Sequence, residues 1–281
     1  MDRPLIVYEP PALRPGHPFA AVRRLASFSD LFLTLSLHRI NVRYKQSRLG
    51  ILWAIIQPLS MMLVFTLMFT LVRAAPSGVV PFPLFAYAGL VPWTMFSSGL
   101  VAASSALTAH ASLLTKVSFP REILPLTYIV AALVDFTLAS VVLGGLMLWF
   151  GVSPGPTVIW AAAAIVVLTA FLTGLSFVLA ALQVRYRDIG LAMPVLMQVW
   201  LFASPVLYPL EAVRHALPGP LYRLYTLNPM AGVIDTFRRA VILHQAPDYA
   251  AFGIAVAVAA LLLPAAYVYF TYAQLTVADT V

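Results

Sequence analysis

The sequence lacks cysteine and is poor in charged residues. With no cysteine among its 281 residues, the chain forms no disulfide and offers no thiolate ligand to a metal. Charged residues make up 10% of the chain, whereas an average soluble domain carries about 25%. So few charges could not cover a surface that faces water, and lipid must therefore be the solvent for much of this protein. The net charge of +7 then indicates basic residues at one membrane face rather than binding of nucleic acid.

Motifs of nucleotide hydrolysis and of nucleophilic catalysis are missing as well. The two lysines, Lys45 and Lys116, both lie outside any GxxxxGK[ST] context, so the sequence has no P-loop. It also has no GxSxG elbow. Histidines without metal-ligand spacing occur at His17, His38, His110, His215 and His244. We therefore predict no catalytic residue and no metal site on this chain.

Six long apolar stretches take up most of the chain. A helix that crosses the hydrocarbon core of a bilayer needs about 20 apolar residues, and each stretch is about that long. The predicted transmembrane helices cover residues 51–72, 84–107, 120–150, 157–183, 190–208 and 250–272. Pro194, Pro205 and Pro209 are expected to kink or end the fifth helix. We therefore predict an all-α integral membrane protein with six transmembrane helices.

The distribution of lysine and arginine predicts the orientation. Six spans put both termini on the same side of the membrane. Twelve basic residues fall on that side, eight of them within residues 1–50, and five fall on the other side. The positive-inside rule therefore places both termini in the cytoplasm. The first apolar run begins only at residue 51 and is longer than the apolar core of a signal peptide, so no cleavable signal is expected.

The run 28–46, ahead of the first span, has two distinct helical faces. The apolar face holds Leu33, Leu37, Ile40 and Tyr44, and the polar face holds Ser36, Arg39, Arg43 and Gln46. This spacing is typical of an amphipathic helix that lies in the cytoplasmic membrane interface. A helix packed on a soluble partner would show the same pattern, so the sequence leaves both interpretations open.

The predicted outer loop, residues 211–248, is long enough to contain structure of its own. Asn228 is a good N-cap, and Pro229 suits the first position of a helix. Apolar residues then recur at helical spacing at Met230, Val233, Ile234, Phe237 and Val241. We predict two short amphipathic helices within 217–243. They either dip back into the bilayer as re-entrant gate helices or rest on its surface.

Asp135 is the one acidic residue deep inside a predicted span. An ionisable residue at such a depth is a functional candidate by default, and a proton-driven carrier would use one. No lysine or arginine lies deep within a span to pair with it. The sequence therefore favours a protonated or hydrogen-bonded structural carboxyl over proton coupling. It predicts that Asp135→Asn leaves transport nearly intact.

An ordered series of motifs resembles the membrane subunits of type-2 ABC exporters that move polysaccharides such as O-antigens, other surface glycans and teichoic acids. The run VRYKQSRLGILWAIIQPLSMMLVF (42–65) is similar to the start of those subunits. Further matches follow in the same order as LVPW (90–93) with FS (96–97), LTKVSFPREILP (114–125), ALVDF (132–136), VRYRD (184–188), SPVLYP (204–209) and LNPM (227–230). The resemblance covers about residues 28–272.

The resemblance implies a homodimer around a channel for a lipid-linked polysaccharide in the bacterial cytoplasmic (inner) membrane. It also implies two separate cytoplasmic ATPase subunits that bind ATP and Mg²⁺, with no cofactor on this chain. The transmembrane domain would cover 28–272, between cytoplasmic tails at 1–27 and 273–281. Contacts with the ATPase are expected at His110, Leu114, Thr115, Lys116 and Phe119, and at Arg39 and Arg43 of the amphipathic run. The expected gate residues are Asn228, Met230, Val233, Ile234 and Phe237.

Aromatic and amide side chains in the first and fifth spans suit a sugar cargo. Aromatic rings stack on the apolar faces of sugars, and amides hydrogen-bond to sugar hydroxyls. The candidate channel-lining residues are Trp53, Gln57, Phe65, Gln198 and Trp200, which would otherwise face lipid or the core. Other functions stay open: a drug or lipid exporter of the same superfamily, or a secondary carrier that uses Asp135. An intramembrane glycan transferase would need an acid cluster or metal site, which the sequence lacks.

Overall fold

The computed structural model describes residues 26–45, 48–71, 80–116 and 119–277, and all regular elements within these ranges are helical. Residues 1–25 of the predicted N-terminal tail and 278–281 of the predicted C-terminal tail lie outside these ranges, and so does Gln46. Residues 273–277 of the predicted C-terminal tail belong to α13. The helices are α2 (Ser29–Lys45), α3 (Trp53–Leu71), α4 (Phe82–Ser104), α5 (Ala106–Ala109), α6 (Ala111–Lys116), α7 (Ile123–Trp149), α8 (Val158–Arg185), α9 (Asp188–Phe202), α10 (Leu210–Ala216), α11 (Gly219–Thr226), α12 (Pro229–Arg238) and α13 (Tyr249–Val277). A 3-10 turn, η1 (Gly50–Leu52), precedes α3, and a π-helical turn, η2 (Arg239–Leu243), follows α12.

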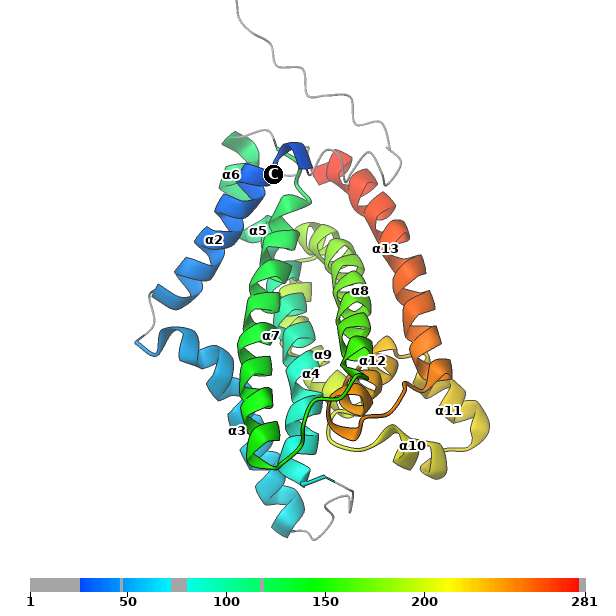
Figure 1. Ribbon diagram of the computed structural model, residues 1–281. Helices are drawn as coiled ribbons and strands as arrows, with labels where there is room; N and C mark the ends of the chain where they lie inside the picture. Colours follow the sequence, from blue (N-terminus) through cyan, green and yellow to red (C-terminus); the bar gives the residue numbers. More distant parts are fainter. Residues whose placement is uncertain (1–25, 46–47, 72–79, 117–118, 278–281) are drawn as a thin grey trace, which may run out of the picture.

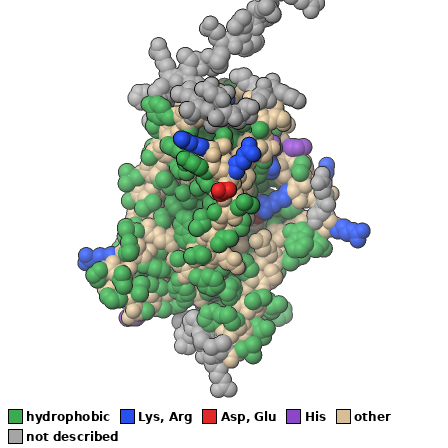
Figure 2. All heavy atoms as spheres, turned by 180° about the vertical axis from the view of Figure 1, so that it is seen from behind, with side chains coloured by type: hydrophobic (Ala, Val, Ile, Leu, Met, Phe, Trp, Pro, Cys, Tyr) green, Lys and Arg blue, Asp and Glu red, His purple; other side chains and the backbone are tan. Residues whose placement is uncertain are grey.

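Five helices are long and apolar enough to cross a membrane: η1 with α3, α4, α7, α8 and α13. They coincide with five of the six predicted spans, which are thereby confirmed as long apolar helices. α2, α5 and α6 lie near the end of the molecule at which α13 ends, and α10, α11 and α12 lie toward the other end (Figure 1). Hydrophobic side chains cover much of the face in Figure 2, as expected for a protein surrounded by lipid.

α4 lies at the centre of the bundle. Of the 18 consecutive residues that are most apolar in α4, 78% are buried inside the protein. For the corresponding 18 residues of η1 and α3, the share is 6%. α4 contacts α3, α7, α8, α9 and α12. Gly99 allows this close packing, because a Cβ at that position would press on Leu172 and Ala132. α3 is therefore attached to the bundle on one side only, and the rest of its surface is available to lipid or to another protein.

The fifth predicted span is shorter than expected. α9 ends at Phe202, so the boundary predicted at residue 208 is wrong. At about 1.5 Å of rise per residue, its 15 residues measure about 22 Å, against a hydrocarbon core of about 30 Å. Residues 203–209 form turns instead of helix, and Pro205 has no N–H to continue the helical ladder. Pro194 lies within α9 and does not end it. A sixth crossing of the membrane therefore stays a prediction.

The short helices predicted after the fifth span are present as α11 and α12, and α10 precedes them. The predicted cap is confirmed: the Asn228 side chain accepts the Met230 N–H at 3.1 Å, and Pro229 occupies the first helical position. Every residue of α12 is buried. The helix packs against α13, α8 and α4. α12 is therefore part of the bundle and does not rest on its surface.

Arg238, the last residue of α12, has the largest fully buried side chain. Its Nη2 donates to the carbonyl oxygens of Pro205 at 2.8 Å and Val206 at 2.6 Å, and its Nη1 donates to the carbonyl of Tyr208 at 3.3 Å. The guanidinium also lies over the Phe85 ring, 3.8 Å from the ring centre. Arg238 thus supplies donors to backbone carbonyls in the break after α9, where helical N–H groups are missing.

The Arg238 side chain keeps its charge in this buried position. Burial lowers its pKa to about 10, which is still far above neutral pH. The three carbonyl oxygens and the face of Phe85 surround the cation and replace part of its hydration. Gly89 of α4 provides the space, because a Cβ there would contact both the guanidinium and the Val206 carbonyl.

Arg238→Gln is expected to destabilise the fold strongly. A glutamine amide is too short and has too few donors to serve the same carbonyls, so buried acceptors lose their partners. Removing one member of a buried charged network typically costs about 3–5 kcal/mol, and we expect the unfolding free energy in detergent to fall by about that amount. The control, Arg223→Gln at an exposed position of α11, should change it by less than about 0.5 kcal/mol. Equal stability of the two variants would contradict the role assigned to Arg238.

Candidate functional site

α2 is attached to the bundle by its polar face and by Tyr44, which the sequence placed on the apolar face. Ser36 is buried, and Arg39 and Arg43 contact residues of α7. Leu33 and Leu37, on the apolar face, are 57% and 60% exposed. An apolar face that points away from the protein is what a helix at a lipid interface requires. The two arginines predicted to contact an ATPase are therefore engaged within this chain, and a further contact of theirs with an ATPase stays a prediction.

Arg39 joins α2 to two other elements. Its guanidinium lies 3.7 Å from the centre of the Tyr128 ring on α7. Its Nη2 hydrogen-bonds to Nε2 of His110, the residue between α5 and α6. Because arginine has donors only, His110 accepts through a ring lone pair and must be neutral in this contact. Burial, followed by the Arg39 charge, lowers the pKa of His110 and favours the same neutral form.

Asp135 has a cationic partner that the sequence did not reveal. Nη1 of Arg43 lies 2.8 Å from Oδ2 of Asp135, and the Tyr44 hydroxyl donates to Oδ1. Burial raises the pKa of Tyr44, so this hydroxyl keeps its proton. The premise that no cation pairs with Asp135 is wrong, because the partner comes from α2, outside the spans. The expectation that Asp135→Asn is nearly neutral therefore loses its basis.

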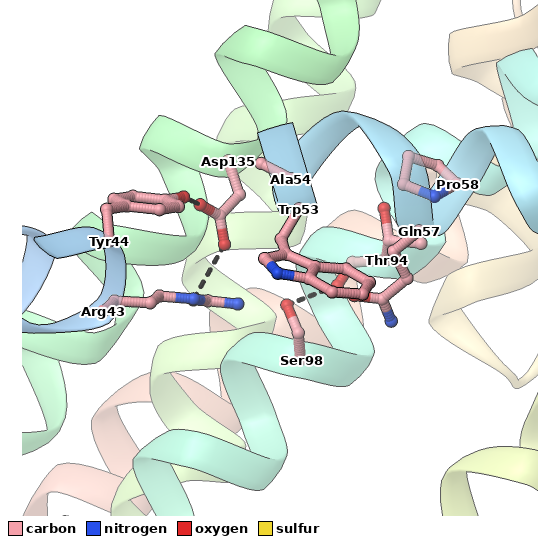
Figure 3. A pocket seen from close by; sticks show the side chains of 9 residues that line it. All are labelled: Arg43, Tyr44, Trp53, Ala54, Gln57, Pro58, Thr94, Ser98 and Asp135. Atoms are coloured by element: carbon pink, nitrogen blue, oxygen red, sulfur yellow. Dashed lines mark hydrogen bonds and ion pairs between the residues drawn. The ribbon is translucent and has the colours of Figure 1, made fainter. Parts of the chain in front are cut away.

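The Arg43–Asp135 pair borders a cavity of about 220 Å³ where α2, α3, α4 and α7 meet (Figure 3). Its lining residues are Arg43, Tyr44, Trp53, Ala54, Gln57, Pro58, Thr94, Ser98 and Asp135. Trp53 and Gln57, both predicted to contact a glycan, stand one turn apart on α3 and share this cavity. The structure thus brings together two of the five predicted channel-lining residues, with the predicted intramembrane acid beside them.

The other three predicted channel-lining residues lie elsewhere. Phe65 is partly buried and packs on the core from α3. Gln198 is exposed on α9. The Trp200 Nε1 donates to Oδ1 of Asn228 at 3.1 Å, and its ring packs edge-on against Phe96. Trp200 therefore supports the capping residue of α12, a structural role that its position in the sequence did not suggest.

The predicted coupling residues, from His110 to Phe119, lie in α6 and next to it, and residues 117–118 lie outside the described part of the chain. Leu114 and Phe119 are partly buried against an apolar cluster that includes Leu107 and Phe177. The side chains of Thr115 and Lys116 lie outside the described part of the chain. Contact of this segment with another protein stays a prediction.

The predicted gate residues are buried within this chain. Met230, Val233 and Ile234 are fully buried, and Phe237 packs edge-on against Phe136 of α7. Asn228 is bound on several sides, because its amide also donates to the backbone of the turn after α9. Any movement of α12 must therefore carry these contacts along or break them.

Sequence reasoning missed Thr94 and Ser98. Thr94, Ser97 and Ser98 stand close together in a mostly apolar span, and the spacing of four that puts Thr94 and Ser98 on one helical face was visible in the sequence. The pairing of α2 with Asp135 left no such signal, because Tyr44 and Asp135 are 91 residues apart and meet only in the fold.

The Arg43–Asp135 pair should contribute measurably to stability. Arg43→Gln and Asp135→Asn should each lower the unfolding free energy, and the double variant should lose less than the sum of the two. Because Arg43 is 39% exposed and partly screened by solvent, we expect a coupling energy of about 1 kcal/mol in a double-mutant cycle. The four proteins are compared by chemical denaturation in detergent. Strictly additive effects would show that the pair is not coupled.

His110 should make the attachment of α2 sensitive to acid. Its pKa is lowered in the folded state, so the native protein binds fewer protons than the unfolded chain at mildly acidic pH. The stabilisation is complete above the ordinary histidine pKa of about 6.5 and is lost as the pH falls through the lowered value. His110→Gln should flatten the fall in unfolding free energy below about pH 6.5. His215→Gln, at an exposed position of α10, should leave the fall in unfolding free energy unchanged. Equal slopes in the two variants would contradict this assignment.

Proteins of similar sequence are transport proteins. The O-antigen export system permease protein RfbA of Myxococcus xanthus is 33% identical over 245 residues, which cover 87% of this chain and 93% of that protein. The protein of the same name from Klebsiella pneumoniae is 25% identical over 210 residues, with 74% and 79% covered. The polysialic acid transport protein KpsM of Escherichia coli is 24% identical over 233 residues, with 78% and 83% covered.

A family model described as ABC-2 type transporter matches residues 30–242, from α2 to the π-helical turn after α12. The match includes four of the five long apolar helices, the α2 contacts and the cavity. Together with the extended similarity to permeases, it shows that this membrane protein belongs to the ABC-2 type transporter family.

Proposed function

We propose that this chain is the permease subunit of an ATP-driven exporter that moves a lipid-linked polysaccharide across the bacterial cytoplasmic (inner) membrane. The observation that carries the proposal is the similarity to an O-antigen export permease over 87% of the chain. The lining of the cavity suits a sugar cargo, because Trp53 offers an aromatic face for stacking and Gln57 an amide for hydrogen bonds.

A separate cytoplasmic ATPase would bind ATP and Mg²⁺ and supply the energy. This follows from the missing P-loop, since an ATP-driven transporter without one needs a partner. α5 and α6 lie at the end of the molecule that also holds α2 and the end of α13 (Figure 1). The Arg39–His110 contact links this segment to α2. A displacement of α6 by the ATPase would therefore reach α2 and, one turn further along, Arg43 at the cavity.

Two copies of the chain would enclose the channel. The outer surface of α3 is largely uncovered, and α9 presents an apolar face outward, formed by Leu191, Val195, Leu196, Val199 and Phe202. Gln198 is exposed on the same helix. A second copy placed against these helices would cover apolar surface and leave amide and aromatic groups at the channel.

The segment 217–243 is kept as the gate in this proposal. Because Val233 is buried by its own chain, the part that moves would be α11, where Leu221 and Leu224 are 51% and 64% exposed. α12 would then act as the fixed base of the gate, held by Asn228 and Arg238.

Two other functions are weighed against this one. A drug or lipid exporter of the same family would share the fold, but it has no need of a cavity with several hydrogen-bonding groups. A proton-driven secondary carrier would use Asp135. The Arg43 partner gives that carboxylate a structural role and makes the carrier less favoured.

The proposal predicts a stable complex of two copies of this chain with two ATPase subunits. The ATPase encoded next to this chain should co-purify with it, and a lipid-linked glycan should stimulate hydrolysis severalfold. Because the chain has no cysteine, single cysteines at Leu114 and Phe119 give clean crosslinking sites. They should capture the ATPase, whereas a cysteine at Ser153, in the α7–α8 turn at the opposite end of α7, should not. Glycan export without nucleotide would refute an ATP-driven exporter and favour the carrier.

A further inference from the structure

The cavity beside the Arg43–Asp135 pair presents several kinds of contact to one small volume. Trp53 is 51% exposed, and its ring lies between the end of Arg43 and Gln57, with Ser98 close by (Figure 3). Thr94 and Ser98 lie on one face of α4. An aromatic face, an amide, two hydroxyls and a guanidinium therefore converge from three helices.

The two hydroxyls present acceptors to the cavity. Oγ1 of Thr94 donates to the carbonyl of Val91 at 3.1 Å, and Oγ of Ser98 donates to the carbonyl of Thr94 at 2.7 Å. A hydroxyl has one proton and two lone pairs, so these internal bonds use the proton and leave the lone pairs. A ligand that donates hydrogen bonds would satisfy them.

The guanidinium of Arg43 presents donors to the same space. Asp135 engages its Nη1, and an arginine has five N–H groups, so further donors are available for a ligand. The far end of the guanidinium extends toward Trp53 and Ser98 in Figure 3. The formal charges of the lining residues cancel, because Arg43 and Asp135 are the charged pair among them.

We propose that this cavity binds a single uncharged pyranose ring. The apolar face of the ring would stack on Trp53, its hydroxyls would donate to Thr94 and Ser98, and its ring or hydroxyl oxygens would accept from Arg43. Gln57 can donate and accept at the edge of the ring. This inference rests on the proposed function and specifies which unit of the glycan the permease holds.

Size and charge both favour this ligand over others. The cavity volume of about 220 Å³ is below the ~300 Å³ at which pockets for drug-sized ligands begin, so its size suits one ring better than two. An anion such as a phosphate or a uronate would bind next to the Asp135 carboxylate, and like charges this close repel each other. A purely apolar ligand would leave Gln57, Thr94 and Ser98 facing it without partners.

A protection experiment tests the proposal on the full-length chain in lipid nanodiscs. Ser98→Cys changes one atom and creates the only cysteine in the protein. The rate at which a water-soluble thiol reagent labels this cysteine is measured at increasing concentrations of methyl α-D-glucopyranoside, mannopyranoside or galactopyranoside. Labelling proceeds from the ligand-free fraction, so the rate should fall about tenfold at ten times the dissociation constant of the bound glycoside. The methyl glycoside of glucuronic acid carries one negative charge, unlike the neutral glycosides. Its half-protection concentration should be at least about tenfold higher than theirs.

Matched variants separate the site from unspecific effects. Adding Trp53→Ala or Gln57→Leu to Ser98→Cys should raise the half-protection concentration about fivefold, because stacking and amide contacts of this kind contribute about 1 kcal/mol. Both side chains are exposed, so neither change disturbs the core. Trp149→Ala, at an 85% exposed position, should leave protection unchanged. Ser153→Cys, in an exposed turn, should show no protection by any glycoside.

Several results would overturn the proposal. A Ser98→Cys protein that is not labelled at all would show that the cavity is closed to water-soluble ligands. Labelling that no neutral glycoside slows, or that the uronide slows at lower concentration, would exclude an uncharged pyranose as the ligand. Those results would leave the exporter proposal standing if a lipid-linked glycan still stimulated the ATPase. Loss of that stimulation, with protection intact, would refute the exporter and keep the sugar site.

Discussion

The buried Arg238 guanidinium is the interaction on which the arrangement of the second half of the chain depends. It bonds the carbonyls of Pro205, Val206 and Tyr208, and so holds the turn in which α9 stops being a helix. Arg238 is the last residue of α12, and its bonds therefore hold that helix in the bundle. On the other side, Gly89 lets the guanidinium approach α4. One cation thus holds the turn at the end of α9, fixes the depth of α12 in the bundle and requires a glycine at position 89 of α4.

Hydropathy was enough to predict the long helices, because a span of about 20 apolar residues has no other stable conformation in lipid. Local chemistry was enough for the start of α12, where Asn228 and Pro229 act within one turn. Pro205 was among the prolines predicted to kink or end the fifth helix, and α9 ends three residues before it. The exact end was not predictable, since apolar residues continue to Leu210 and the turn that follows is held by Arg238, a distant residue. The partner of Asp135 was missed for a similar reason. Arg43 lies in a different element, and hydropathy carries no information about how elements meet.

Two groups of ion pairs attach outer helices to the bundle. Midway along α7, Asp135 pairs with Arg43 of α2. Directly after α12, Arg239 pairs with Asp235 at 2.8 Å and also with Glu211 of α10. Burial raises the pKa of Asp235, an effect that the arginines oppose. In each group an arginine links a peripheral helix to the bundle. The Arg43–Asp135 and Arg239–Glu211 pairs each have one exposed partner, and pairs of this kind are weak enough to open and close during a transport cycle.

The short length of α9 has a consequence for the bilayer around it. A helix of about 22 Å in hydrocarbon about 30 Å thick leaves a mismatch of about 8 Å. Lipids next to a short helix compress toward its length, at a cost of a fraction of a kcal/mol per ångström. If α9 crosses the bilayer, as the sequence predicts, the membrane along it is expected to be thinner than elsewhere around the protein. A polar headgroup that moves from one leaflet to the other beside α9 would have a shorter stretch of hydrocarbon to cross.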